Sequence, residues 1–489
     1  RMSYLKFDKT VMINLEESLM REVLRTNRVG AYHSSTVVDC NTRKYHGLLV
    51  MPVPALDEDN HVLLSSLDET VIQHGAEFNL GLHKYGENDF SPKGHKYIRE
   101  YTCDTVPRTL YRVGGVIFSK EKVFSQYENR IMIKYTLEDA HSATTLRFRP
   151  FLAFRNVKDL TYANNNLNQS YTEVPNGIKM CLYAGYPNLF MQFSKKATFV
   201  YDPQWYYGIE YPKEQERGYP YKEDLFVPGY FELPIKKGES VIFSAGDCQT
   251  ATTRLKSLYE TEAQCRTPRT NFFNCLKNSA QQFYFRPTAD DAYLLAGYPW
   301  FKVRARDLFV SAPGCTLAID DPVRFEKIMA TCLPALSAFM EDGAEDNVIK
   351  EISEPDVLLW AIWAIQQYAK EMGIEKTNEL YKEFVEEAIQ YILDQKHPNL
   401  HVMDSGLIFA DGGKDKAISW MNSMVNGKPV VPRSGYMVEF NALWYNALCF
   451  LKEMNGGTAD KRIEELIKAL DISFPNTFVN GFNYLFDYV

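Results

Sequence analysis

Residues 252–284 have the sequence TTRLKSLYETEAQCRTPRTNFFNCLKNSAQQFY, and this stretch separates two unlike halves of the chain. Apolar residues recur in it at helical spacing, which predicts one or two helices. Before it, short β-branched and aromatic runs alternate with turn residues, as in residues 130–135, 145–151 and 189–193. After Arg304 the apolar residues follow the helical period. We therefore expect a large β-sandwich followed by a helical domain.

The second half contains helical patterns joined by long loops. Its predicted helices cover residues 306–312, 322–339, 356–372, 377–395, 439–454 and 460–471. The first of them is expected to stop at Pro313-Gly314, because proline interrupts helical hydrogen bonding. The loops at residues 341–354 and 398–436 are polar or rich in glycine. Helical pairs joined by such loops predict helix-on-helix packing, with function carried by the loops.

The length of the chain sets its domain organisation. A chain of 489 residues is too long for one ordinary core, which predicts two or three domains. We expect residues 1–250 to form an N-terminal β-sandwich domain, residues 251–285 a helical linker, and residues 286–489 a helical domain.

Charge and cysteine usage exclude several classes of protein. The net charge is −8, with acidic and basic residues interspersed, so nucleic-acid binding is not expected. The nine cysteines are scattered singly, which is typical of reduced thiols and predicts a cytoplasmic protein. No apolar run has the length of a transmembrane helix, and no His, Asp and Glu residues have metal-ligand spacing. We therefore expect no membrane association, no metal and no cofactor.

Aromatic residues make up 14% of the chain, and most of them are expected in hydrophobic cores. Trp363 and Trp444 lie within helical patterns and are predicted core residues. Trp300 follows Tyr298-Pro299, and Trp420 lies in a loop or at a helix start. The last two tryptophans are the better candidates for platforms on which a sugar ring stacks.

Arg306 and Asp307 fall in the first turn of a predicted helix, shortly after the Trp300 loop. An inward-facing pair of this kind could bind several sugar hydroxyl groups. Alternatively, Asp307 is a carboxylate that caps the helix N-terminus, and Arg306 forms a salt bridge. The spacing supports the two interpretations equally.

Two further segments carry carboxylates at predicted helix starts. Asp356 and Trp360 are four residues apart and share one helix face. The simpler alternative is a first-turn carboxylate beside a core tryptophan. Glu439 opens an apolar helix after the polar loop that contains Asn422 and Arg433. Its apolar neighbours make burial plausible, and a buried carboxylate needs a partner; otherwise it is an ordinary helix-start residue.

A fourth motif lies near the N-terminus, in residues 27–32 and 41–50. Asn41 and Gly47 are turn residues that frame a short basic stretch, and an apolar run follows them. The residues alone favour a tight turn with an internally bonded His46.

These motifs resemble, in the same order, those of the bacterial glycogen-debranching enzyme family, in its amylo-α-1,6-glucosidase part. The N-terminal signature is Asn-Thr-Arg-Lys-Tyr-His-Gly-Leu-Leu at residues 41–49. The helical half carries Gly-Tyr-Pro-Trp-Phe at 297–301, Arg-Asp at 306–307, Pro-Asp-Val-Leu-Leu-Trp at 355–360, Trp-Met-Asn at 420–422, Pro-Arg at 432–433 and Val-Glu-Phe-Asn-Ala-Leu-Trp at 438–444. The resemblance spans nearly the whole chain.

The resemblance implies a β-supersandwich followed by an (α/α)6 toroid-type helical barrel. It also implies inverting hydrolysis that releases α-1,6-linked glucose from branch stubs of glycogen or limit dextrin. Such hydrolysis uses two carboxyl groups about 6.5–9.5 Å apart, one as acid and one as base.

The resemblance assigns roles to individual residues. Glu439 is implied as a candidate acid or as support for the acid. Substrate contacts are implied for Trp300, Arg306, Asp307, Asp356, Trp360, Trp420 and Arg433.

Three departures from the family pattern bear on the chemistry. Asn422 stands where the family has the aspartate of its general acid, and an amide cannot donate an acidic proton; Glu439 is the nearest carboxyl group. The segment Arg304-Ala-Arg-Asp307 replaces the family's Trp-Gly-Arg-Asp. The family continues with further helices that carry the base, so we expect an incomplete barrel that belongs to a longer protein, and we assign no base.

Two rival functions follow from these departures. A non-catalytic glucan-binding or regulatory protein would explain Asn422. A disaccharide phosphorylase or another exo-α-glucosidase would share the two-part architecture, although the four motifs argue against it.

Overall fold

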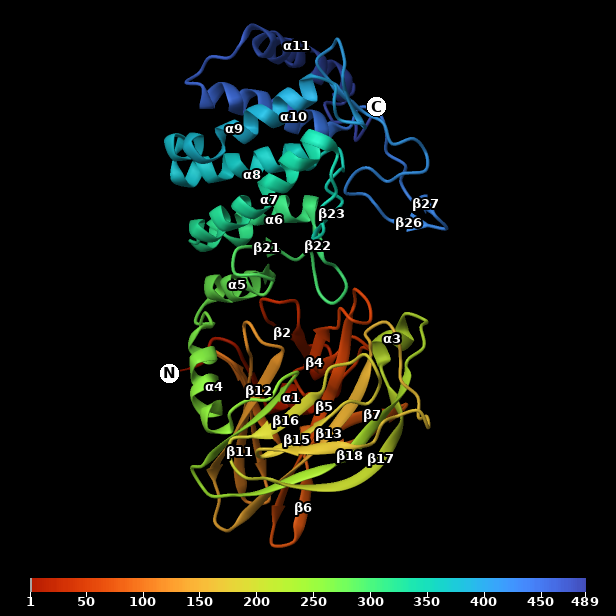
Figure 1. The fold of residues 1–489 in the computed structure, drawn as a ribbon, viewed down its shortest axis with the longest axis vertical. Coiled ribbons are helices and arrows are strands. Elements are labelled where there is room, and N and C mark those ends of the chain that lie inside the picture. Colours follow the sequence, from red (N-terminus) through yellow and green to blue (C-terminus); the bar gives the residue numbers. More distant parts are fainter. Residues whose placement is uncertain (1) are drawn as a thin grey trace. The chain divides into compact units, whose positions relative to one another are not determined.

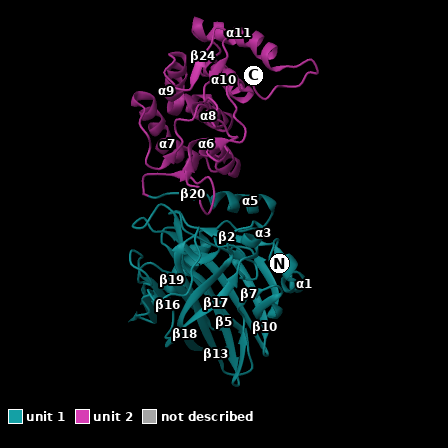
Figure 2. Cartoon of the chain, turned by 90° about the vertical axis from the view of Figure 1, so that its right-hand side faces the viewer, with its two compact units in different colours: residues 1–287 teal, residues 288–489 magenta. Residues whose placement is uncertain are grey.

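The computed structural model describes residues 2–489. The chain divides into two compact units (Figure 2): unit 1 comprises Arg1–Pro287 and unit 2 comprises Thr288–Val489. No helix among the described residues is long and apolar enough to cross a membrane.

Unit 1 contains two large antiparallel sheets (Figure 1). The first sheet comprises, in order across it, β1 (Lys6–Asp8), β9 (Ile98–Cys103), β10 (Pro107–Val113), β11 (Val116–Phe124), β12 (Arg130–Asp139), β19 (Ser240–Gly246), β16 (Leu189–Phe193), β15 (Gly177–Met180) and β14 (Tyr171–Val174). The second comprises β17 (Thr198–Glu210), β18 (Lys222–Ile235), β13 (Thr144–Asn156), β5 (Asn60–Gln73), β4 (Gly47–Pro52), β3 (Tyr32–Thr36) and β2 (Glu22–Thr26), with β6 (Ala76–Asn79) beside β5.

The two sheets pack face to face through large aromatic side chains. On β10, buried positions alternate with half-buried or exposed ones, as a strand with one core-facing side requires. The rings of Phe118 and Tyr135, both from the first sheet, stack 5.6 Å apart between centroids. Tyr135 then contacts Phe148 of the second sheet at 4.9 Å. This packing confirms the predicted β-sandwich.

Two helices end unit 1. They are α4 (Leu255–Gln264) and α5 (Phe272–Gln281), which fall within the predicted linker of residues 251–285. Leu255 and Tyr259, one helical turn apart, are buried on one face of α4 against residues of β11, β12 and β19. Helix α4 therefore packs on the first sheet as a part of unit 1.

Unit 2 consists mainly of six helices (Figure 1): α6 (Ala305–Cys315), α7 (Pro322–Asp342), α8 (Val357–Met372), α9 (Ile374–Leu393), α10 (Val438–Met454) and α11 (Lys461–Phe478). Helix α8 packs against α6 on one side and α10 on the other, while α7 packs against α9 and α11 against α10. Helices α6, α8 and α10 thus form one layer, and the helices between them in sequence form another. This is the helical domain that the sequence predicts, with three helix pairs among the described residues.

Two helices continue through a proline beyond their predicted ends. Helix α6 continues through Pro313, the predicted stop, to Cys315. Helix α11 continues past residue 471 and through Pro475 to Phe478. A proline removes one helical hydrogen bond. Buried side chains near each proline, such as Ala312 in α6 and Phe478 in α11, keep the helix in place.

Candidate active site

A buried ion pair joins α6 to the start of α8. The guanidinium of Arg306, in the first turn of α6, donates from Nε to Asp356 Oδ2 at 2.8 Å and from Nη2 to Oδ1 at 2.7 Å. Both residues are buried, with exposed fractions of 7% and 1%. Although burial opposes the charged form, the hydrogen bonds and charge of Asp356 hold the pKa of Arg306 above its usual value. This bidentate geometry fixes both side chains.

Trp360 completes the buried pair. Its indole Nε1 donates to Asp356 Oδ2 at 3.0 Å, as the four-residue spacing on α8 allows. The ring of Trp360 also lies edge-on to Trp363, 5.5 Å away between centroids. The structure therefore brings together three of the residues that the sequence singles out.

Glu354 is a fourth member of this cluster, and the sequence did not identify it. Its Oε2 lies 3.7 Å from Arg306 Nη2, and its side chain is 24% exposed. Burial raises the pKa of Glu354 to about 7; Arg306 opposes the rise, and the charges of Glu351 and Asp356 add to it. A carboxyl group that holds its proton near neutral pH has the property that a general acid needs.

The crowding of acidic residues was the only sequence signal for Glu354. Three carboxylates, at positions 351, 354 and 356, occur within six residues. Like charges held close together raise the pKa of at least one of them.

The segment that precedes Trp420 lies against the same cluster. The carbonyl oxygen of Ile418 is 3.5 Å from Arg306 Nη2, and the charge of Lys416 acts on Glu354. Trp420 follows directly, with 60% of its surface exposed. Asn422 is also exposed, and its backbone N–H donates to the Trp420 carbonyl at 3.0 Å.

Glu439 lies in a separate ion pair at the start of α10. Arg433 donates to Glu439 from Nη1 at 2.6 Å and from Nη2 at 2.7 Å, and from Nη2 to Asp487 Oδ1 at 2.9 Å. Burial opposes the charge on Arg433, but the two carboxylates raise its pKa. Both carboxylate oxygens of Glu439 accept hydrogen bonds from the Arg433 guanidinium, so this geometry favours the supporting role for Glu439 over that of the acid. The terminal nitrogens of Arg433 are bound to protein carboxylates.

The remaining predicted residues are exposed. Asp307 faces solvent while its neighbour Arg306 is buried, so the two side chains leave α6 in different directions. Arg306 is salt-bridged, and its partner is Asp356 rather than Asp307. Trp300 is 39% exposed and lies edge-on to Phe301, 5.8 Å between centroids. The substrate contacts of Asp307 and Trp300 stay predictions.

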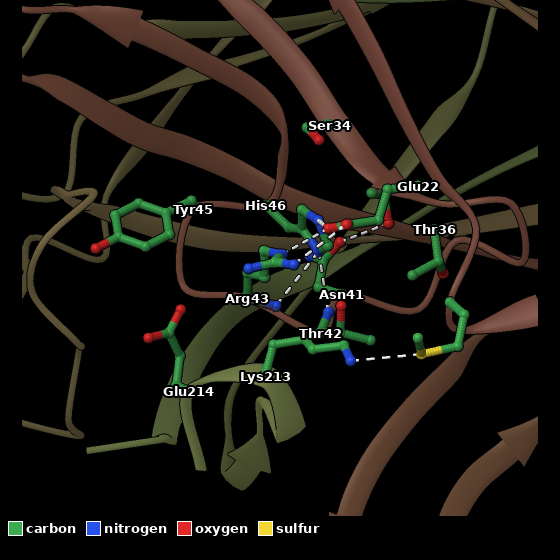
Figure 3. A network of polar contacts seen from close by, with 12 residues as sticks. Glu22, Ser34, Thr36, Asn41, Thr42, Arg43, Tyr45, His46, Lys213 and Glu214 are labelled. Carbon is green, nitrogen blue, oxygen red and sulfur yellow. Dashed lines mark hydrogen bonds and ion pairs between the residues drawn. The ribbon is translucent and has the colours of Figure 1, made fainter. Parts of the chain in front are cut away.

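The N-terminal motif forms an internally bonded turn in unit 1 (Figure 3). His46 Nδ1 accepts from the backbone N–H groups of Thr42 at 3.0 Å and Arg43 at 3.3 Å, so its Nε2–H donates to Glu22 at 2.8 Å. Burial opposes the charge of Glu22, but the bonds from His46 and Arg43 lower its pKa to about 2. The turn interpretation predicts this arrangement. Among residues 2–489, no group of three or more His, Cys, Asp and Glu side chains is placed to hold a metal ion.

Comparison with protein-family models identifies both parts of the chain. Residues 21–242 match the model described as the glycogen debranching enzyme N-terminal domain, and residues 277–489 match the model described as amylo-alpha-1,6-glucosidase. The two matches cover most of the 489 residues. The chain therefore belongs to the glycogen debranching enzyme family, and this membership supports a glucan-active enzyme.

Other comparisons give only remote similarity. No curated protein matches the chain. Among solved structures, a putative kojibiose phosphorylase from the human microbiome is similar over 97% of this chain and 70% of its own, with 10% identity and a TM-score of 0.39. A bacterial glucoamylase complexed with acarbose is similar over 98% of this chain and 68% of its own, with 10% identity and a TM-score of 0.42. Family membership thus rests on the two family models.

Proposed function

We propose that this chain is a glycoside hydrolase that releases α-1,6-linked glucose from the branch stubs of glycogen or limit dextrin, with inversion at the anomeric carbon. The match of residues 277–489 to the amylo-alpha-1,6-glucosidase model carries the proposal. The same residues contain the buried cluster of Arg306, Glu354 and Asp356.

The cluster provides a proton donor in place of the missing aspartate. Hydrolysis requires a carboxylic acid that protonates the leaving glycosidic oxygen while a second carboxylate activates water. Asn422 cannot supply that proton. Glu354, with its pKa raised to about 7 chiefly by burial, holds a proton on an appreciable fraction of molecules at neutral pH. We assign the acid to Glu354 ahead of Glu439, which is paired with Arg433, and we assign no base.

Asp356 and the exposed residues have supporting roles in this scheme. Asp356 is held in position by hydrogen bonds from Arg306 and Trp360, and its charge helps to raise the pKa of Glu354. It is therefore a positioning residue. The exposed indoles of Trp300 and Trp420 offer faces for stacking of sugar rings, and the exposed carboxylate of Asp307 offers acceptors for sugar hydroxyl groups.

A second candidate function is that of a glucan-binding or regulatory protein without catalysis. The observation that favours it is the amide of Asn422 at the position of the family's acid. It predicts binding of limit dextrin without release of glucose.

Glucose release from phosphorylase-limit dextrin by the full-length gene product separates the two functions. We expect the unmodified protein to release glucose and Glu354→Gln to lose that activity. Glu439→Gln should still release glucose when it is assayed at a temperature at which the variant is folded. β-Glucose as the first product, detected by NMR, would establish inversion. If the unmodified protein binds dextrin but releases no glucose, and Asn422→Asp gains activity, the second function holds and Glu354 is not the acid.

A further inference from the structure

Unit 1 contains an open cavity of about 750 Å3, built entirely from its own residues. The elements around it are α2 (Leu15–Ser18), β7 (Leu82–Gly86), β8 (Asp89–Lys93), the 3-10 turn η1 (Gly94–Tyr97), the end of β17 and α3 (Pro212–Glu216). Sites for small ligands have volumes of about 300–1,000 Å3. The cavity is therefore large enough for a ligand of several rings.

A buried histidine forms part of the cavity wall. His95 is only 6% exposed and lines the cavity. Its Nδ1 is buried and has no hydrogen-bond partner among the described residues. Burial, followed by the charges of Lys96 and Lys93, lowers the pKa of His95 to about 4, so the ring is neutral at pH 7. The neutral ring therefore adds no charge to the cavity wall.

The charges on the cavity wall balance one another. The lining includes the cations Lys84, Lys93 and Lys96 and the anions Glu16, Glu87 and Glu210. Lys84 Nζ and Glu210 Oε1 form an ion pair at 2.8 Å, in which the side chains are 13% and 7% exposed. Three positive and three negative groups give no net charge, so the cavity selects neither a polyanion nor a cation. Its donors and acceptors suit a neutral polar ligand.

Aromatic and amide groups complete the lining. Phe90 and Tyr221 are half-buried, and their rings leave part of their surface accessible beside the cavity. Asn88 and Gln215 add exposed amides that both donate and accept hydrogen bonds. A sugar ring has apolar faces and hydroxyl edges, and this mixture of rings, amides and balanced charges matches both.

We propose that the cavity is a second glucan-binding site, which holds a short α-glucan segment through residues of unit 1 alone. The carbohydrate chemistry follows from the lining, while the choice of an α-glucan rests on the proposed function. The site has no catalytic role. It retains the polymer on the protein while branch stubs are processed elsewhere.

Affinity electrophoresis of the full-length protein in gels containing glycogen tests the proposal. We expect Tyr221→Ala and Gln215→Ala to bind glycogen roughly five- to tenfold more weakly, because each removes a stacking or hydrogen-bonding group. Tyr207→Ala is the matched control, because Tyr207 is 64% exposed and lies outside the cavity lining. Thermal melting of each variant shows whether it is folded.

The readouts separate failure of the site from failure of the proposed function. Glucose release from a short α-1,6-glucosyl maltooligosaccharide should be unchanged in Tyr221→Ala and Gln215→Ala. If no protein releases glucose but the cavity variants still lose glycogen binding, the site stands and the proposed hydrolase does not. If folded cavity variants bind glycogen as tightly as the Tyr207→Ala control, or if inorganic phosphate rather than maltoheptaose displaces the glycogen, the second glucan site is refuted.

Discussion

Removal of Asp356 should destabilise unit 2 strongly. Asp356→Ala deletes both acceptors of the buried Arg306 guanidinium and the acceptor of the Trp360 indole N–H. Glu354, 3.7 Å from Arg306, is a poor replacement because burial favours its protonated form. Breaking one side of a buried ion pair costs about 3–5 kcal/mol, because it leaves an uncompensated charge. We expect a loss of stability in that range.

Urea denaturation at pH 7, followed by tryptophan fluorescence, measures this loss. Trp205 is the only tryptophan in the sequence outside unit 2, so the signal reports mainly on that unit. Asp307→Ala is the control: its side chain is exposed on the same helix turn as Arg306, and its effect should stay within about 0.5 kcal/mol. The double variant Arg306→Leu/Asp356→Leu should recover much of the loss, because it leaves no unpaired charge. A loss below about 1 kcal/mol in Asp356→Ala would refute the ion pair as the element that joins α6 to α8.

Four further predictions follow from the described contacts. Glu354→Gln should lower kcat for glucose release about 100-fold or more with little change in KM, as loss of a general acid does; an unchanged kcat would remove Glu354 from the reaction. Because the pKa of Glu354 is raised from 4.5 to about 7, its protonated form stabilises the fold below pH 4.5, and this contribution is lost as the pH rises through 7. Urea denaturation should therefore show Glu354→Gln gaining stability relative to the unmodified protein at pH 8 but not at pH 4. Conversely, the pKa of Glu22 is lowered to about 2, so the stability that its carboxylate contributes is present above pH 4.5 and is lost as the pH falls toward 2. Glu22→Gln should therefore destabilise unit 1 at pH 7. A loss of stability that is equally large at pH 2 would contradict the His46 and Arg43 contacts. Phe148→Ala should lower the stability of unit 1 by about 3–5 kcal/mol in thermal or urea denaturation, because it opens a cavity between the sheets; a change near zero would mean that the sheets do not pack through this ring.

The sequence predicted the two-part fold because its signals are local. Alternation along β10 and helical periodicity along α8 depend only on neighbouring residues. The ends of α6 and α11 were less predictable, since a proline stops a helix only where packing does not hold the next turn. Packing holds the turns that follow Pro313 and Pro475, so α6 and α11 continue past these prolines.

The candidate site was predictable only in part, for the same physical reason. The contact between Asp356 and Trp360 follows from their spacing on one helix. The pairing of Arg306 with Asp356 joins residues 50 positions apart, and spacing says nothing about it. The pKa of Glu354 depends on burial and on Arg306, which only the folded chain brings near, as well as on its sequence neighbour Glu351. The sequence therefore could not predict these electrostatic interactions between distant parts of the chain.

The raised pKa of Glu354 links proton affinity to water access. Burial is the largest cause of that raised value, and the segment of Lys416 and Ile418 lies against the cluster. Water that reached the carboxyl group would lower its pKa toward 4.5, so the proton on Glu354 records how well water is excluded from this part of unit 2.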